Sequence, residues 1–459
     1  MFKNLKSSIV NFPRLGLVGL IKQYITPWSI RRPATALLVI LNAPWALPCV
    51  FILRCLRPWY VVRLGSITCD HIGHFILEVN WLWALRQQQT SKSLDLYWFF
   101  QFNSIFNSWV IAKPCNQFYA AMVRRNFLIY PGFLLQPISV WNRIIPGGKV
   151  HHVPNSWERI PYPGRPVDGT MAKIQGNMPF LPEEDAQAQA WLRQQGWQDG
   201  EPFVCLLVRD SAFKAEKDHQ KEYTIRNSDI LTYGQAAEWL AAQGVWVLRM
   251  GKKMDRPVPT THPRIVDYAF HPEKSDLLDI WLFAHCDLCI TTGSGPDLLS
   301  NFYGHPVLLI NYVPIIWLLS FSHATCFPKK LLWQSSDTPL NLLECLDYSY
   351  RCTEWSSLYA EQGIQVVDLT AEEILAAVQE QWQRLQGTWV DSNLDQDRQY
   401  RFLELFKNHP RFYDNHNWIH PEFRVGSTWL RSMGDDFLIP TSGQHNPDQL
   451  RGSRDNYHK

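Results

Sequence analysis

The chain of 459 residues has almost no net charge, because 44 Lys and Arg residues offset 42 Asp and Glu residues. The net charge is therefore too small to indicate that the protein binds nucleic acid, and it does not indicate an acidic protein partner either. Charged residues are also few, at 19%, whereas hydrophobic residues make up 46%. Disordered chains have the opposite balance, so we expect about two to three folded domains with large cores.

Several catalytic signatures are missing. No G-x-x-x-x-G-K-[ST], G-x-S-x-G or H-E-x-x-H occurs, which argues against P-loop, serine-hydrolase and zinc-protease chemistry. Cys286 and Cys289 have no second pair to complete a zinc site of about four ligands. Asp395-x-Asp397 has the spacing of metal-dependent transferases of another fold, but it does not follow a predicted strand. We therefore expect no metal, no cofactor and inert thiols, as in a reducing compartment.

The N-terminal region lacks acidic residues. Six Lys and Arg occur in the first 32 residues, and no cleavable signal peptide is evident. Residues 33–53 then carry no charge, a length that suits a bilayer span of about 20 residues. Pro44 and Pro48 would interrupt a spanning helix, and Arg54 and Arg57 make the second flank basic too. We favour a segment that lies in the cytoplasmic leaflet of the inner membrane, over a span or a buried helical hairpin.

What the sequence does contain is a repeated alternation of strand and helix patterns. In the first half we expect strands at 60–67, 94–100 and 109–112, and helices near 73–86 and 116–125. Residues 146–179 are rich in Pro and Gly and read as a loop between domains. The second half begins with a helix at Pro182. Its further strands are expected at 203–208, 245–250, 264–268, 287–292 and 305–311, and its helices at 229–243, 275–286 and 296–303. The alternation is typical of parallel sheets in Rossmann-like units.

A glycine turn between a predicted strand and a helix, CITTGSGPDLLSNF at 289–302, is the strongest functional signal. Gly293 and Gly295 permit close approach of the backbone to a ligand, and Pro296 suits the first helical position. Exposed N–H groups and the helix dipole favour an anion there, and a nucleotide diphosphate is the obvious candidate. A plain strand-to-helix turn that needs glycine for its geometry is the alternative.

Polar and basic residues follow the neighbouring strands, at what should be the same edge of the sheet. An arginine there can bind phosphate in a bidentate way, although a surface ion pair is the better explanation for each one taken singly. Together they predict an electropositive crevice. Its expected members are Arg209, Asp210, Arg226, Asn227, Arg249, Gly251, Thr291, Thr292, Gly293, Ser294, Gly295, Asp297 and Lys329.

A second cluster lies at the first predicted strand-to-helix turn, in TCDHIGHFILEVN at 68–80. Asp70, His71 and His74 gather there, and Gly73 allows a tight turn. A carboxylate or imidazole facing a cleft could remove the proton from an acceptor hydroxyl. A capping Asp and a structural His are the alternative.

These motifs, in this order, resemble a family of bacterial glycosyltransferases from surface-polysaccharide and lipopolysaccharide gene clusters. The resemblance covers roughly residues 60–390 and rests on GSITCDHIGHFILE, FLPEEDAQAQAWLRQQGW, PFVCLLVRDSAF, EYTIRNSDILTYGQAAEWLAAQGVWVLRMG, SDLLDIWLFAHCDLCITTGSGPDLLSNFYGHPVLLIN and FPKKL. It implies an α/β fold of the GT-B type, in which two Rossmann-like domains face a central cleft. The implied organisation is a basic, hydrophobic N-terminal segment (1–58), an acceptor domain (59–180), a nucleotide-sugar domain (181–390) and a partly disordered C-terminal extension (391–459).

By the same resemblance, the expected activity is transfer of a sugar from a nucleotide-sugar donor to a surface-glycan acceptor, which we expect to be lipid-linked. The glycine turn and the basic residues would bind the donor without a metal, and Asp70, His71 and His74 would be catalytic. We expect a cytoplasmic protein, peripherally associated with the inner membrane, that binds no nucleic acid. The alternatives are a nucleotide-sugar epimerase-like enzyme on the same fold and a non-catalytic polysaccharide-assembly protein.

Overall fold

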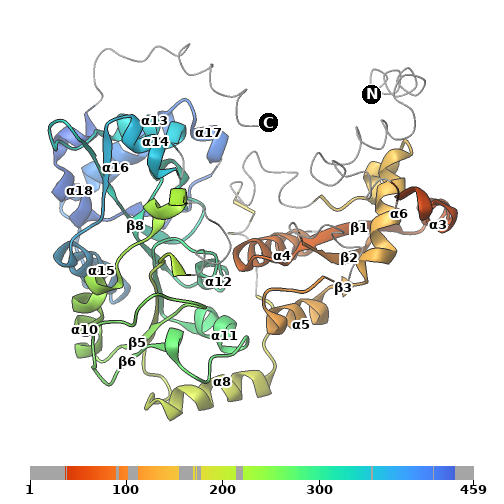
Figure 1. The fold of residues 1–459 in the computed structure, drawn as a ribbon, viewed down its shortest axis with the longest axis horizontal. Helices are drawn as coiled ribbons and strands as arrows, with labels where there is room; N and C mark the ends of the chain where they lie inside the picture. The colour runs from red at the N-terminus through yellow and green to blue at the C-terminus, as the bar shows by residue number, and fades with distance from the viewer. Residues whose placement is uncertain are drawn as a thin grey trace.

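The computed structural model describes residues 37, 39–88, 93–101, 112–154, 169–170, 172, 177–212, 221–352, 355–416 and 418–439. These residues form two α/β domains, each built on a parallel sheet (Figure 1). The expected fold class is therefore confirmed. No helix in this described part of the chain has the length and apolar character needed to cross a bilayer.

The N-terminal domain has a three-stranded parallel sheet in the order β1-β2-β3. Its elements are α3 (Ala43–Cys55), β1 (Val61–Thr68), α4 (Ile72–Gln87), β2 (Ser93–Phe100), α5 (Gln117–Asn126), β3 (Leu128–Ile129) and α6 (Gly132–Ile144). α3 packs on α6, where Val39, Ala46 and Val50 meet Val140 and Trp141. One face of the predicted N-terminal segment is thus buried in this domain, whereas the strand expected at 109–112 falls mostly outside the described residues.

The C-terminal domain has a seven-stranded parallel sheet in the order β12-β9-β8-β7-β4-β5-β6. Its strands are β4 (Phe203–Leu207), β5 (Trp246–Arg249), β6 (Ile265–Val266), β7 (Leu288–Thr291), β8 (Val307–Tyr312), β9 (Ala324–Pro328) and β12 (Arg424–Val425). The chain starts in the middle at β4, runs outward to β5 and β6, and then crosses to β7 on the other side. This reversal between β4 and β7 is where ligands bind in doubly wound sheets, beyond the carboxyl ends of the strands.

Helices cover this sheet and complete the core. They are α8 (Pro182–Gln194), α10 (Gly234–Ala242), α11 (Leu278–His285), α12 (Asp297–Phe302), α13 (Leu342–Cys352), α14 (Ser356–Glu361), α15 (Ala371–Leu385), α16 (Asn393–Asn408), α17 (Phe412–Asn415) and α18 (Ser427–Met433). Short 3-10 turns lie at Lys221–Arg226, Ile230–Tyr233 and Tyr268–Phe270, and β10 (Lys330–Trp333) pairs antiparallel with β11 (Ile364–Val367). The expected helix at 229–243 is therefore a 3-10 turn followed by α10.

Residues beyond 390 differ from the separate extension that the sequence suggests. β12 pairs with β9 at the edge of the main sheet, and buried Phe402 and Phe406 of α16 join the main core. The Asp395 carboxylate caps α16 by accepting the Ser392 N–H, and it pairs with Arg431. The described part of this region therefore belongs to the C-terminal domain, and Asp395 is structural. Residues 440–459, for which disorder is expected, lie outside the described residues.

The two domains meet where the carboxyl end of β1 and the carboxyl end of β7 each lead into a helix. A Cβ built on Gly73 of α4 would lie 2.7 Å from the Cα of Gly295, which is closer than real Cβ atoms approach. The N-terminus of α4 thus lies directly against the glycine turn before α12. Only residues without side chains allow two backbones this close.

A second contact holds the start of α5 against the C-terminal domain. The Gln117 N–H donates to Asp276 Oδ2 at 2.6 Å, and Asn116 Nδ2 donates to the Asp276 carbonyl at 2.9 Å. Asp276 thus places a carboxylate at a helix N-terminus, where unpaired N–H groups and the helix dipole favour negative charge. Phe180, in the segment between the domains, stacks on Phe118 of α5 and packs against Tyr303.

The Gly73–Gly295 contact generates a stability prediction. Gly73→Ala should lower the thermal unfolding midpoint, because its Cβ would push the Gly295 backbone away, at a cost of about 1–3 kcal/mol for overpacking. Helix propensity alone predicts the opposite sign, since Ala is favoured over Gly by about 1 kcal/mol within a helix. Differential scanning calorimetry decides between them, and an unchanged or raised midpoint would show that the domains do not need this close approach.

Candidate functional site

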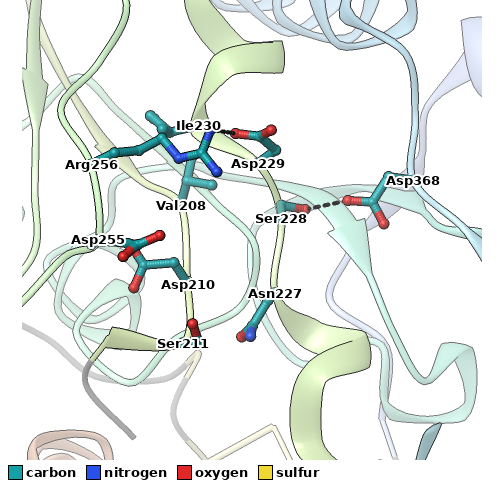
Figure 2. Close-up of a pocket in the computed structure, with 10 residues that line it drawn as sticks. All are labelled: Val208, Asp210, Ser211, Asn227, Ser228, Asp229, Ile230, Asp255, Arg256 and Asp368. Carbon is teal, nitrogen blue, oxygen red and sulfur yellow. Dashed lines mark hydrogen bonds and ion pairs between the residues drawn. The ribbon is translucent and has the colours of Figure 1, made fainter. Parts of the chain in front are cut away.

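A cavity of about 270 Å³ opens beyond the carboxyl ends of β4 and β5 (Figure 2). Residues of four separate chain segments line it, and most of them are polar. They are Val208, Asp210, Ser211, Asn227, Ser228, Asp229, Ile230, Asp255, Arg256 and Asp368. Of the residues predicted for a donor site, only Asp210 and Asn227 line this cavity. It is nevertheless at the sheet edge where the doubly wound topology places ligands.

One wall of the cavity is a hydrogen-bonded polar network. Ser228 Oγ donates to Asp368 Oδ2 at 3.0 Å, as Figure 2 shows, and accepts a hydrogen bond from Asn311 Nδ2. Asn311 is fully buried and has a left-handed backbone with φ of 54°, which is uncommon for a residue other than glycine. Behind the wall, Lys329 Nζ pairs with Asp368 at 2.5 Å and donates to the Asn227 carbonyl. These bonds fix Asn227, Ser228 and Asp368 relative to one another.

Lys329, predicted to hold phosphate, is only 3% exposed at its side chain. Burial lowers the pKa of its ammonium group, and the neighbouring Asp368 carboxylate opposes that shift. Lys329 therefore positions Asp368 from behind the cavity, whereas Asp368 itself is 39% exposed at its side chain and accessible to a ligand.

Arg249 differs more sharply from the prediction of a phosphate-binding residue. Its side chain is completely buried, with Asp210 at 3.9 Å and Asp267 at 3.7 Å, and it donates to the Arg256 carbonyl at 3.2 Å. Asp210 in turn accepts hydrogen bonds from the Ala212 and Asp255 N–H groups. This buried charge cluster shapes the loops at the cavity floor, and Arg249 cannot reach a bound anion.

The electrostatic character of the cavity is mixed. Four carboxylates, those of Asp210, Asp229, Asp255 and Asp368, line it together with the Arg256 guanidinium. Arg256 Nη1 lies 3.7 Å from Asp229 Oδ1 at the cavity edge, and both side chains are about half exposed. Carboxylate and amide oxygens accept hydrogen bonds from hydroxyl groups, as sugars and ribose offer. The arrangement thus suits a polyhydroxylated ligand that carries one negatively charged group near Arg256.

Two N–H groups of the glycine turn, those of Gly293 and Ser294, already have partners within the turn. The Gly293 N–H donates to Thr291 Oγ1, and the Ser294 N–H donates to Asp297 Oδ2 at 2.7 Å. Thr291 Oγ1 also donates to Asp297, and α12 has only six residues. A Cβ on Gly293 would lie 2.6 Å from the Tyr312 ring. Asp297, Thr291 and Thr292 are buried, so their side chains hold this turn from within.

The other predicted donor residues lie between the turn and the cavity. Arg226 Nη2 donates to the Gly293 carbonyl at 2.7 Å, directly before the lining residue Asn227. The Arg209 N–H donates to Thr292 Oγ1, which joins the end of β4 to the end of β7. The Gly251 carbonyl accepts a hydrogen bond from Lys274 Nζ and thereby serves loop structure. Arg226 thus links the turn to the cavity lining, and Arg209 lies between the lining residues Val208 and Asp210.

The structure brings the first motif to the same junction. His71 is the N-cap residue of α4, and its Nδ1 lies 3.2 Å from Asp70 Oδ1. The His71 side chain is 44% exposed, and its ring meets that of His74 edge-on. Burial and the neighbouring His71 lower the pKa of His74, which keeps that imidazole neutral. A partly exposed imidazole next to a carboxylate is one of the arrangements that can act as a general base.

Sequence reasoning missed Ser228, Asp229, Asp255, Arg256 and Asp368. They lie in loops with no periodic pattern, and only Asp229 gives a local signal, since its side chain accepts the Leu231 N–H as a helix cap. Asp368 follows β11, which lies outside the main sheet. For Asp368, the only indication in the sequence was its position in a loop directly after a strand.

Two candidate metal motifs receive no support. Across the described residues, no group of three or more His, Cys, Asp or Glu side chains is arranged to hold a metal ion. Cys286 and Cys289 are buried, and burial raises the pKa of the Cys289 thiol well above its usual range. Both cysteines therefore pack as small apolar residues.

Comparison with known proteins gives distant structural likenesses. No protein-family model matches the chain, and no curated protein matches its sequence. Among solved structures it is similar to a family 9 glycosyl transferase from Veillonella parvula, at 13% identity and a TM-score of 0.37, with 69% of this chain and 96% of that chain covered. It is also similar to the ADP-heptose lipopolysaccharide heptosyltransferase II of E. coli, at 10% identity and a TM-score of 0.32. That match covers 54% of this chain and 84% of the heptosyltransferase chain.

A UDP-N-acetylglucosamine 2-epimerase of Listeria monocytogenes, named as putative, is similar at 10% identity and a TM-score of 0.25, covering 71% of this chain and 97% of that chain. All these TM-scores lie below 0.5, so the fold assignment rests on the topology of this chain itself.

Asp297 generates a pH prediction. Burial raises the pKa of its carboxyl group from 3.8 to about 6, so the folded state binds this proton more tightly than the unfolded state. The free energy of unfolding should therefore fall by on the order of 2–3 kcal/mol as pH rises from about 4 to about 6. In Asp297→Asn this part of the slope should disappear, and stability at pH 7.5 should equal or exceed that of the wild type. Urea unfolding between pH 4 and pH 7.5 measures the free energy of unfolding of the wild type and of Asp297→Asn. An unaltered slope in the variant would contradict the raised pKa of Asp297.

Proposed function

We propose that this protein is a glycosyltransferase that takes a sugar from a nucleotide-sugar donor. The cavity beyond β4 and β5 is the observation that carries the proposal. It lies at the ligand-binding edge of a doubly wound sheet, and its lining of Asp229, Asp368 and Asn227 suits hydroxyl groups. Nucleotide sugars combine many hydroxyl groups with a diphosphate.

The diphosphate is assigned to arginine side chains instead of to the glycine turn. Arg256 lines the cavity, and Arg226 lies directly before the lining residue Asn227. Guanidinium groups bind phosphate oxygens in a bidentate way and stabilise the charge that develops on a leaving diphosphate. The turn then serves as the rigid support for Arg226, whose guanidinium it holds through the Gly293 carbonyl.

The acceptor is assigned to the N-terminal domain. The Gly73–Gly295 contact holds the start of α4, and with it His71, at the junction with the donor domain. His71, oriented by Asp70, would remove the proton from the acceptor hydroxyl as that oxygen attacks the anomeric carbon and the nucleoside diphosphate leaves. The acceptor is a growing surface glycan, and a lipid-linked form of it suits the basic, hydrophobic N-terminus.

Donor binding gives the first test of this function. In isothermal titration with UDP, ADP, GDP and CDP, at least one nucleotide should bind. Arg256→Ala should weaken its binding by about tenfold or more, because a charge-assisted hydrogen bond to phosphate is lost. The corresponding nucleoside, which lacks phosphate, should bind both proteins equally.

Arg193→Ala is the matched control, because Arg193 pairs with Asp199 at an exposed site on α8, outside the cavity lining. Equal effects of the two substitutions would remove the assigned role of Arg256. Failure of every nucleotide and nucleotide sugar to bind the wild type would sink the proposed function altogether.

The catalytic assignment is tested separately from binding. His71→Ala should lower the transfer rate by about 10²–10⁴-fold while donor affinity stays unchanged, because a general base acts only in the transition state. Transfer is followed by release of nucleoside diphosphate in the presence of acceptor. A donor that is epimerised without any acceptor would instead identify an epimerase. Unchanged transfer by His71→Ala would return His71 to a structural role.

A further inference from the structure

α3 is apolar on both of its sides. Ala46, Val50 and Leu53 are buried against the domain. The opposite side is exposed at positions three to four residues apart, which places them in one stripe along the helix. The stripe contains no polar residue and consists of Pro44, Leu47, Pro48, Phe51, Ile52 and Cys55. Phe51 is 70% exposed and Ile52 is 58% exposed. Solvent-facing helix sides are normally polar, so this stripe indicates a binding surface.

Aromatic residues extend the stripe at the C-terminal end of α3. Trp59 and Tyr60 follow the helix and are 70% and 56% exposed. Figure 1 shows α3 and α6 at the outer end of the N-terminal domain, on the side away from the C-terminal domain.

The near-neutral whole chain conceals a strong charge asymmetry. Residues 1–157 contain 16 Lys and Arg against 3 Asp and Glu, a net charge of +13. Residues 158–459 contain 28 against 39, a net charge of −11. Of the three acidic residues in the first part, Asp95 pairs with Arg63 and Glu78 is completely buried. Among the described residues of the N-terminal domain, basic residues outnumber acidic ones nine to three, and they accompany an exposed apolar helix.

We propose that the exposed side of α3, with Trp59 and Tyr60, docks onto a bilayer that contains anionic lipids. This proposal does not depend on the proposed enzymatic function. The apolar stripe would enter the acyl boundary, Trp and Tyr would lie at headgroup depth, and basic residues such as Arg57 and Lys149 would face lipid phosphates. A protein partner of this area would be expected to bring acidic groups, whereas an anionic leaflet supplies both an apolar layer and negative charge.

The geometry favours a helix lying in the membrane plane. α3 has 13 residues and is therefore about 20 Å long, shorter than the roughly 30 Å hydrocarbon core. Its other side is already occupied by α6. Arg54 turns back to donate to the Asn142, Ile145 and Pro146 carbonyls at the end of α6, which ties α3 to the domain. The helix can thus anchor the folded domain to a surface without leaving it.

The test uses the full chain and extruded vesicles of phosphatidylcholine alone or with 30% phosphatidylglycerol, an amount chosen at roughly physiological anionic content. The wild type should co-sediment with the anionic vesicles, at least tenfold more strongly than with neutral ones, and added salt should weaken the binding. The double substitution Phe51→Glu, Ile52→Glu should reduce binding at least tenfold. Val390→Glu, Leu394→Glu is the matched control, since these residues are 84% and 62% exposed on the other domain; it should bind as the wild type does.

A second readout places α3 at the membrane directly. Cys55 is the exposed cysteine on the stripe, whereas the other nine are buried or partly buried. A polarity-sensitive fluorophore on Cys55 should shift to the blue and brighten with anionic vesicles, and Cys55→Ser should lose the signal. The proposal is overturned by equal binding of the two double variants, by absence of vesicle binding, or by an unshifted fluorophore on bound protein. It is equally overturned if Phe51→Glu, Ile52→Glu instead dissociates a dimer, which would assign the stripe to a second copy.

Discussion

The approach of two bare backbones at Gly73 and Gly295 is the constraint on which the rest of the molecule depends. It brings the helix that follows β1 against the turn that follows β7, so the carboxyl ends of both sheets share one junction. A side chain at either position would collide with the opposite backbone, and His71 lies only two residues before Gly73. Gly73 and Gly295, which have no side chains, thus help to set the geometry between the proposed base and the proposed donor site.

In the C-terminal domain, the residues that fix the loops are different from the accessible residues that line the cavity. In the turn at 291–297, Thr291 and Asp297 accept the N–H groups of Gly293 and Ser294, and these bonds fix its shape. Buried Lys329 and Asn311 fix the cavity wall through Asp368 and Ser228. In the proposed donor site, the charge of a bound diphosphate would therefore be stabilised by side chains near solvent. Such an arrangement separates fold stability from ligand binding, because the groups that bind are not the groups that hold the loops.

The charge asymmetry would orient the protein on an anionic surface. The basic N-terminal domain carries its exposed apolar helix at the end farthest from the C-terminal domain (Figure 1). The acidic C-terminal domain would be repelled by an anionic surface that attracts the other domain. A protein docked through α3 would therefore hold the proposed acceptor side next to the membrane and the proposed donor cavity toward the aqueous side, which suits the proposed transfer from a soluble donor to a lipid-linked glycan.

The sequence by itself determined the alternation of helices and strands, because side-chain periodicity is local. β4, β5, β7 and β8 occur close to their expected positions, and the parallel sheets follow from their order. Only the tertiary structure decided that β12 joins the sheet edge, that Arg249 is buried between two carboxylates, and that Asp297 accepts the Ser294 N–H of the turn. The cavity lining was equally hidden, since it assembles loops far apart in the chain. Which loops meet, and which charges they bury, depends on contacts between distant residues that no local pattern records.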